Sequence, residues 1–140
     1  MPSSRIVGID VGTKRIGLSR SDPTALIATP VGTFSVQEVF NELLRLHQED
    51  TIRKFVVGWP LSEKGHLNTS TDMVDEFIRR LEKKFPDVEV IRVDERYSSE
   101  RAKQALIDSG VKRKKRAQKG LVDSTAATIL LQEYLDGIYS

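Results

Sequence analysis

The chain has 140 residues, of which 39% are hydrophobic and 30% are charged, and its formal net charge is +2. This composition excludes an intrinsically disordered protein, and the absence of cysteine excludes disulfides and thiolate chemistry. Because no apolar run approaches the ~18 residues of a membrane span and the first residues do not resemble a signal peptide, we expect one cytoplasmic domain over residues 1–140, with no membrane partner.

The first quarter of the chain predicts three strands joined by short turns. Residues 5–11 are apolar and β-branched and predict a buried strand, residues 12–15 supply a turn, and residues 16–19 return as a second strand. Residues 25–34 predict a third strand at the edge of the sheet, a position that suits Pro30. Three adjacent strands with short turns indicate an antiparallel meander.

The remainder alternates between helices and strands. Ser35 and Glu38 form a capping-box pattern ahead of a helix whose apolar residues continue to Leu46. The elements expected after it are a buried strand over 55–57, a polar loop over 61–68, a helix over 73–81, a strand over 88–93, a helix that ends at Gly110, and a last helix over 121–135.

This order of elements predicts an α/β fold with a mixed five-stranded sheet. The sheet consists of the antiparallel meander plus two parallel strands and is flanked by helices. The order fits a ribonuclease H-like domain better than a doubly wound Rossmann domain, in which strands alternate with helices from the start.

Carboxylates stand at unusual places in this pattern. Asp10 interrupts an apolar strand, Asp94 and Glu95 lie where another strand ends, and Asp123 lies in the opening turn of the last helix. A carboxylate inside a buried strand is costly unless it is paired, hydrogen-bonded or bound to metal. For either Asp10 or Asp123 alone, a structural role explains the pattern about as well as a catalytic one. Asp10 could accept hydrogen bonds from the following turn, and Asp123 could favour a helix N-terminus.

Taken together, the carboxylates predict a metal site. If the two central strands lie side by side, Asp10 and Glu95 come close, and small residues around Ala126 let the last helix approach. Oxygen ligands without His or Cys suit Mg²⁺ or Mn²⁺ rather than Zn²⁺, and two such ions can support in-line phosphoryl displacement. We therefore predict catalytic and metal-binding roles for Asp10, Glu95 and Asp123, and leave Asp94 open as a further ligand.

Basic residues gather between Arg96 and Lys119. Nine basic and two acidic residues give this stretch a charge of +7, so the rest of the chain carries −5. Such asymmetry is typical of a face that meets a polyanion, although most charge runs are solvated helix faces. The residues expected to contact nucleic acid, chiefly through phosphate, are Lys14, Arg15, Arg96, Lys112, Arg113, Lys114, Lys115, Arg116 and Lys119.

Four segments resemble, in order, the motifs of the YqgF/RuvX family. They are GIDVGTKRIG (8–17), VVGWPLS (56–62), VDERYSS (93–99) and KRKKRAQKGLVDSTAATILLQEYL (112–135), and together they extend over almost the whole chain. The resemblance implies a ribonuclease H-like fold related to the RuvC resolvases, and cytoplasmic hydrolase activity in maturing the 5′ end of 16S ribosomal RNA. Carried over by motif, Asp10, Glu95 and Asp123 are the acidic site residues, and Asp94 is either a further ligand or turned away.

The expected activity is therefore that of an Mg²⁺- or Mn²⁺-dependent nuclease acting on an rRNA precursor, with ribosomal particles as partners. A Holliday junction resolvase that cuts branched DNA shares this chemistry but is expected to act as a symmetric dimer. No sequence feature marks a dimer interface, so we expect a monomer or a weak homodimer. A non-catalytic RNA-binding assembly factor is a further alternative, whereas a nucleotide-binding module like the actin-like ATPases needs two such domains to clamp ATP.

Overall fold

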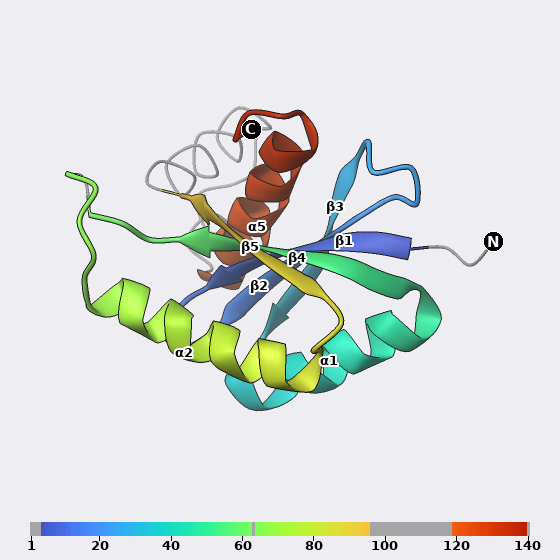
Figure 1. Ribbon diagram of the computed structural model, residues 1–140, viewed down its shortest axis with the longest axis horizontal. Helices are drawn as coiled ribbons and strands as arrows, with labels where there is room; N and C mark the ends of the chain where they lie inside the picture. Colours follow the sequence, from blue (N-terminus) through green and yellow to red (C-terminus); the bar gives the residue numbers. More distant parts are fainter. Residues whose placement is uncertain (1–3, 63, 96–118, 140) are drawn as a thin grey trace.

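The structure, a computed structural model, describes residues 4–62, 64–95 and 119–139, with only the backbone of residues 119–124. At its centre lies a five-stranded sheet in the order β3-β2-β1-β4-β5 (Figure 1). The strands are β1 (Ser4–Val11), β2 (Ile16–Ser21), β3 (Ala28–Phe34), β4 (Thr51–Trp59) and β5 (Glu89–Asp94). The first three pair antiparallel, and β4 and β5 run parallel to β1, which confirms the predicted mixed sheet.

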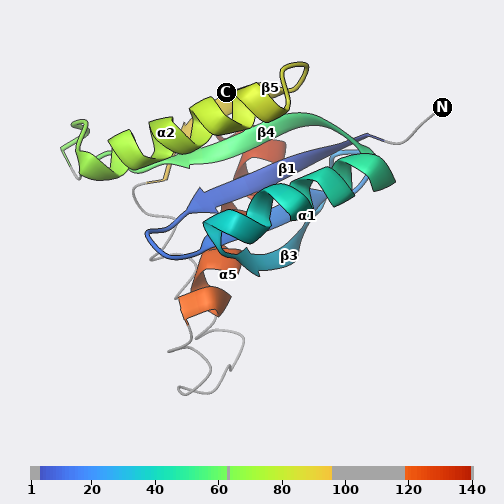
Figure 2. The same cartoon turned by 90° about the horizontal axis from the view of Figure 1, so that it is seen from below.

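Helices cover both faces of this sheet. α1 (Val36–Glu49) and α2 (Thr69–Lys84) lie on one face, and α5 (Lys119–Leu135) lies on the other (Figure 2). The larger apolar core lies between the sheet and the α1/α2 layer, and a smaller one forms around Leu130 and Leu131 of α5. Because side chains alternate along a strand, successive residues of the central strands face one helical layer and then the other.

Both helices of the α1/α2 layer begin at side-chain caps. The Ser35 hydroxyl accepts a hydrogen bond from the Glu38 N–H, and the Glu38 carboxylate accepts one from the Ser35 N–H, which confirms the predicted capping box. Asn68 and Thr71 form the equivalent box in front of α2. This second box explains why α2 begins before the apolar residues that predicted it.

The prediction of where the third strand begins was wrong. β3 begins at Ala28 because the Asp22 carboxylate accepts backbone N–H groups between Thr24 and Ile27 and holds that segment in a turn. Within the turn, Ala25 has a φ of 60°, which is incompatible with a strand. Hydrogen bonds from the Thr24 hydroxyl and then from the backbone hold the pKa of Asp22 well below its usual value. The edge position of β3 is confirmed.

β4 is longer than the predicted residues 55–57, since its polar first half pairs with the start of β1. The helix expected before Gly110 and the basic residues 96–116 lie outside the described residues. In the part of the chain that is described, no helix combines the length and the apolar character needed to cross a bilayer.

Candidate active site

Asp10 lies near the carboxyl end of β1, on the sheet face that α5 covers. A Cβ atom built on Gly8 would lie 2.8 Å from Leu131 Cβ and 3.0 Å from the Ala127 carbonyl oxygen, so Gly8 faces α5. Residues two apart in a strand share a face, so Asp10 faces the same layer. It is 9% exposed. A buried carboxylate therefore projects from the central strand toward the helix that carries Asp123.

Glu95 follows β5 and folds back over β4. Its backbone N–H donates to the Trp59 carbonyl oxygen at 3.3 Å. Its carboxylate lies against Gly58, where an added Cβ would come within 2.8 Å of the carboxylate carbon. Val56 and Val93 pack into the core beneath α5, and Gly58 and Glu95 each follow two residues later on the same face. The absence of a side chain at Gly58 thus creates the space that the Glu95 carboxylate occupies.

The strand register brings Asp10 and Glu95 together. β1 and β4 run parallel with Ile9 opposite Val57, so the next residues, Asp10 and Gly58, lie at the same level. Neighbouring strands are about 4.8 Å apart. The Glu95 carboxylate, seated over Gly58, therefore lies one strand away from Asp10 on the same face and at the same edge of the sheet.

Asp94 lies on the opposite side. It is the last residue of β5 and pairs with Trp59 of β4. Trp59 packs against the core beneath α1 and α2, with the Arg92 guanidinium 5.2 Å from its ring centre. Arg92 in turn donates to the Asp75 carboxylate of α2 at 2.9 Å. Of the two adjacent acidic residues, strand alternation therefore directs Glu95 toward α5 and Asp94 toward α2.

The direction of α5 places Asp123 near the same edge. The Ser19 hydroxyl, at the middle of the sheet, donates to the Ala127 carbonyl oxygen at 2.8 Å, and the Gln132 side chain accepts the Ala28 N–H at 2.9 Å near the amino end of β1. α5 thus runs antiparallel to β1. Asp123, one helical turn before Ala127, lies on the side of the carboxyl end of β1.

The third carboxylate and most of the basic residues predicted to contact nucleic acid fall outside the described side chains. These include the side chains of Asp123 and Lys119, and all of residues 96–116. Among the side chains that the structure describes, no three His, Cys, Asp or Glu residues form a metal-binding group. Lys14 and Arg15 are exposed in the turn between β1 and β2, directly after the strand that carries Asp10.

Sequence reasoning did not identify the two glycines that position these groups. Gly8 lets the α5 backbone approach β1 closely, and Gly58 accommodates the Glu95 carboxylate. A glycine inside a strand often marks close approach of another group, and both glycines interrupt apolar strands in the sequence. That signal was available.

Comparison with known proteins places the chain in a family. A family model described as "RuvX: Holliday junction resolvase" matches residues 4–137. The chain belongs to the RuvX family. A relative from Chlorobium luteolum is 49% identical to this RuvX chain, and the match covers 96% of both chains. A relative from Salinibacter ruber is 45% identical, and the match covers 95% of this chain and 93% of the relative. Both carry names that describe them as candidate pre-16S rRNA nucleases.

Solved structures of RuvC share the fold of this RuvX chain. RuvC from Thermus thermophilus in complex with a Holliday junction substrate superposes with a TM-score of 0.58 at 16% identity, over 96% of this chain and 95% of RuvC. A second structure of Thermus thermophilus RuvC gives a TM-score of 0.52. The similarity confirms the predicted ribonuclease H-like fold.

Proposed function

We propose that this RuvX chain is a metal-dependent nuclease that hydrolyses phosphodiester bonds in the precursor of 16S rRNA, in maturation of its 5′ end in the cytoplasm. The observation that carries the proposal is the convergence of Asp10 and Glu95 at one edge of the sheet, beside the start of α5. The names of the relatives supply the substrate class.

The chemistry of the donor set fits a hard divalent cation. Asp10 is buried and Glu95 is half-buried, so two carboxylates share a region of restricted solvation on one face of the sheet. Like charges so placed repel each other, and a divalent cation relieves that repulsion. We assign Asp10, Glu95 and Asp123 as the ligands, with Mg²⁺ or Mn²⁺ as the cation. When bound, the cation supplies Lewis-acid polarisation of the phosphate and an acidified water.

The chain's own residues provide positioning. Asp10 is held by a central strand between two neighbours, and the Glu95 carboxylate is seated in the space over Gly58, so both carboxylates are positioned before substrate arrives. Such preorganisation removes the need to reorder these groups during reaction. Lys14 and Arg15, exposed beside Asp10, bind phosphates that flank the cleaved bond.

Holliday junction resolution is the second candidate function. The description of the matching family model and the RuvC fold favour it. Resolution of a four-way junction requires two paired incisions and hence a symmetric dimer, whereas processing of a single RNA end requires only one site. Oligomeric state and substrate therefore separate the two functions.

The deciding experiment incubates the purified chain with pre-16S rRNA and, separately, with a four-way DNA junction in Mg²⁺ or Mn²⁺. We expect RNA cleavage that disappears in excess EDTA and in Asp10→Asn, while the variant still binds RNA. Cleavage that persists in EDTA would contradict the metal mechanism. Cleavage of the junction alone would select the resolvase, and binding of RNA without metal-dependent cleavage would select an assembly factor.

A further inference from the structure

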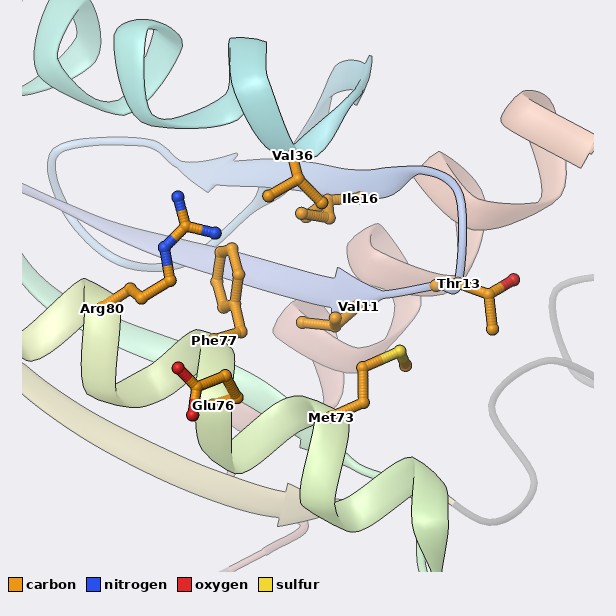
Figure 3. Close-up of a pocket in the computed structure, with 9 residues that line it drawn as sticks. Val11, Thr13, Ile16, Val36, Met73, Glu76, Phe77 and Arg80 are labelled. Atoms are coloured by element: carbon orange, nitrogen blue, oxygen red, sulfur yellow. The ribbon is translucent and has the colours of Figure 1, made fainter.

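Two hollows lie on the α1/α2 side of the sheet, away from α5. One, of about 240 Å³, opens at the carboxyl end of β1 (Figure 3), and the other, of about 470 Å³, lies between α1 and the end of α2. The first hollow is lined by residues that include Val11, Met73 and Phe77, and the second by Phe40, Lys83 and Lys84. Arg80 lines both hollows, so they are adjacent, and we call the two together the α1–α2 groove.

The groove carries positive charge that the described part of the protein does not neutralise. Arg80, Lys83 and Lys84 are exposed, and none of them forms an ion pair with a carboxylate of the described residues. The neighbouring Arg79 differs, because it binds the Glu76 carboxylate at 2.6 Å. That contact also neutralises the carboxylate that lines the groove. Three adjacent cations therefore remain available to an anionic ligand.

Arg80 presents a flat surface at the junction of the two hollows. Its guanidinium carbon lies 4.8 Å from the centre of the Phe40 ring, and Phe40 is itself held by Phe77, with 5.3 Å between ring centres. Figure 3 shows Arg80 and Phe77 both extending from α2 toward the β1–β2 side. One face of the guanidinium rests on an aromatic ring, and the exposed residue leaves the other face to the groove. Nucleic-acid bases stack on planar arginine groups held in this way.

The groove and the proposed catalytic site meet at the carboxyl end of β1. Asp10 faces α5, while the next residue, Val11, lines the groove on the other side of the same strand. The exposed turn over residues 14–15 lies between them. A polynucleotide bound at Asp10 can therefore cross this basic turn and enter the groove. From Met73 to Lys84, α2 provides about 16 Å of length, which matches about five stacked nucleotides.

We propose that the α1–α2 groove binds a single-stranded segment of the nucleic acid that flanks the cleaved bond. One base stacks on the Arg80 guanidinium, and Lys83 and Lys84 bind phosphates. Stacking on Arg80 requires an unpaired base, because the faces of the bases inside a duplex are already covered by their neighbours. The inference rests on the proposed function for the identity of the substrate, and it deepens that function by assigning a second contact surface.

The test compares two triple variants with the same change of charge. One is Arg80→Gln, Lys83→Gln and Lys84→Gln, and the control is Arg45→Gln, Arg53→Gln and Lys64→Gln, which removes exposed cations outside the groove. Binding of labelled single-stranded RNA and DNA is measured by fluorescence anisotropy in EDTA, over a range of salt concentrations. We expect the groove variant to bind about tenfold more weakly or worse and, because two phosphate contacts are lost, to lower the slope of log affinity against log salt by about 1.4.

A second measurement locates the bound strand. RNA that contains photoreactive 4-thiouridine is crosslinked to the wild-type chain, and mass spectrometry is expected to find the adduct on the α2 segment from Met73 to Lys84. Equal affinities for the two triple variants, or crosslinks that avoid α2, would overturn the inference. Both outcomes are expected if the groove binds a protein segment and not nucleic acid. Cleavage by the wild-type chain is assayed in parallel. Failure to cleave would refute the nuclease proposal and leave the comparison of binding variants intact.

Discussion

The substitution Gly58→Ala tests how the two described carboxylates are brought together. The new methyl carbon would lie 2.8 Å from the Glu95 carboxylate carbon, with one carboxylate oxygen closer still, whereas ordinary contacts are 3.4–4 Å. The carboxylate carbon must therefore move by at least 0.6 Å and the oxygen by more. The new methyl also lies 3.2 Å from Leu130 Cδ1, a contact that a side chain can relieve by a small shift.

We expect this displacement to impair catalysis far more than folding. A misplacement of about 1 Å can lower the rate about 100-fold, or about 2.7 kcal/mol in activation free energy. The cost in stability is expected to be small, at about 1 kcal/mol, because the group that must move is the end of a half-buried side chain. The measurements are single-turnover cleavage of pre-16S rRNA and urea unfolding of the same preparations.

A double-mutant cycle with Glu95→Ala separates this explanation from a general packing defect. If Gly58 acts by seating the Glu95 carboxylate, Gly58→Ala has almost no further effect on rate once that carboxylate is removed. Independent, multiplicative losses of rate in the double variant would refute the reasoning. So would a Gly58→Ala variant that cleaves as fast as the wild type.

Four further outcomes are expected. Asp10→Asn and Asp123→Asn should each abolish cleavage and retain RNA binding, and Mn²⁺ should raise the Tm of the wild-type chain but not that of either variant, as thermal denaturation with and without metal will show. Gly8→Ala should destabilise the fold by about 1–3 kcal/mol in urea, because its methyl meets the Ala127 carbonyl and Leu131 Cβ, which flexible side-chain movement cannot clear. Neutralising the basic residues 112–116 should weaken RNA binding and lower its salt slope by about 3–4, measured by anisotropy. Ser35→Ala, which removes the cap of α1, should cost about 1 kcal/mol in urea unfolding and leave the cleavage rate unchanged.

Much of the fold was predictable because local signals agreed with the global arrangement. Short turns between the first three apolar runs required an antiparallel meander, and the alternation of helices and strands after Ser35 required parallel additions to it. The capping box at Ser35 placed the start of α1 correctly. The start of β3 was misplaced because the hydrogen bonds of Asp22 override the β propensity of the residues that follow it.

The site was predictable in composition but not in geometry. Asp10 and Glu95 stood out as acidic residues at the ends of apolar strands, but the register of β4 against β1 and β5 decides that the Glu95 carboxylate lies over Gly58, next to Asp10 on the same face. Alternation at the end of β5 also separates Asp94 from Glu95, which two adjacent letters in a sequence do not reveal. The α1–α2 groove depends on how two helices pack, so no single segment indicates it.

The attachment of α5 has a consequence for how activity responds to denaturant. Among the helices that the structure describes, only α5 covers this face of the sheet; it is joined to β2 by the hydrogen bond from Ser19 to Ala127 and to β1 by close packing at Gly8. It can therefore detach as a local unit while the five strands and the opposite helical layer remain folded. Detachment removes Asp123 from the proposed site, so we expect loss of cleavage at urea concentrations that leave the circular dichroism of the sheet intact.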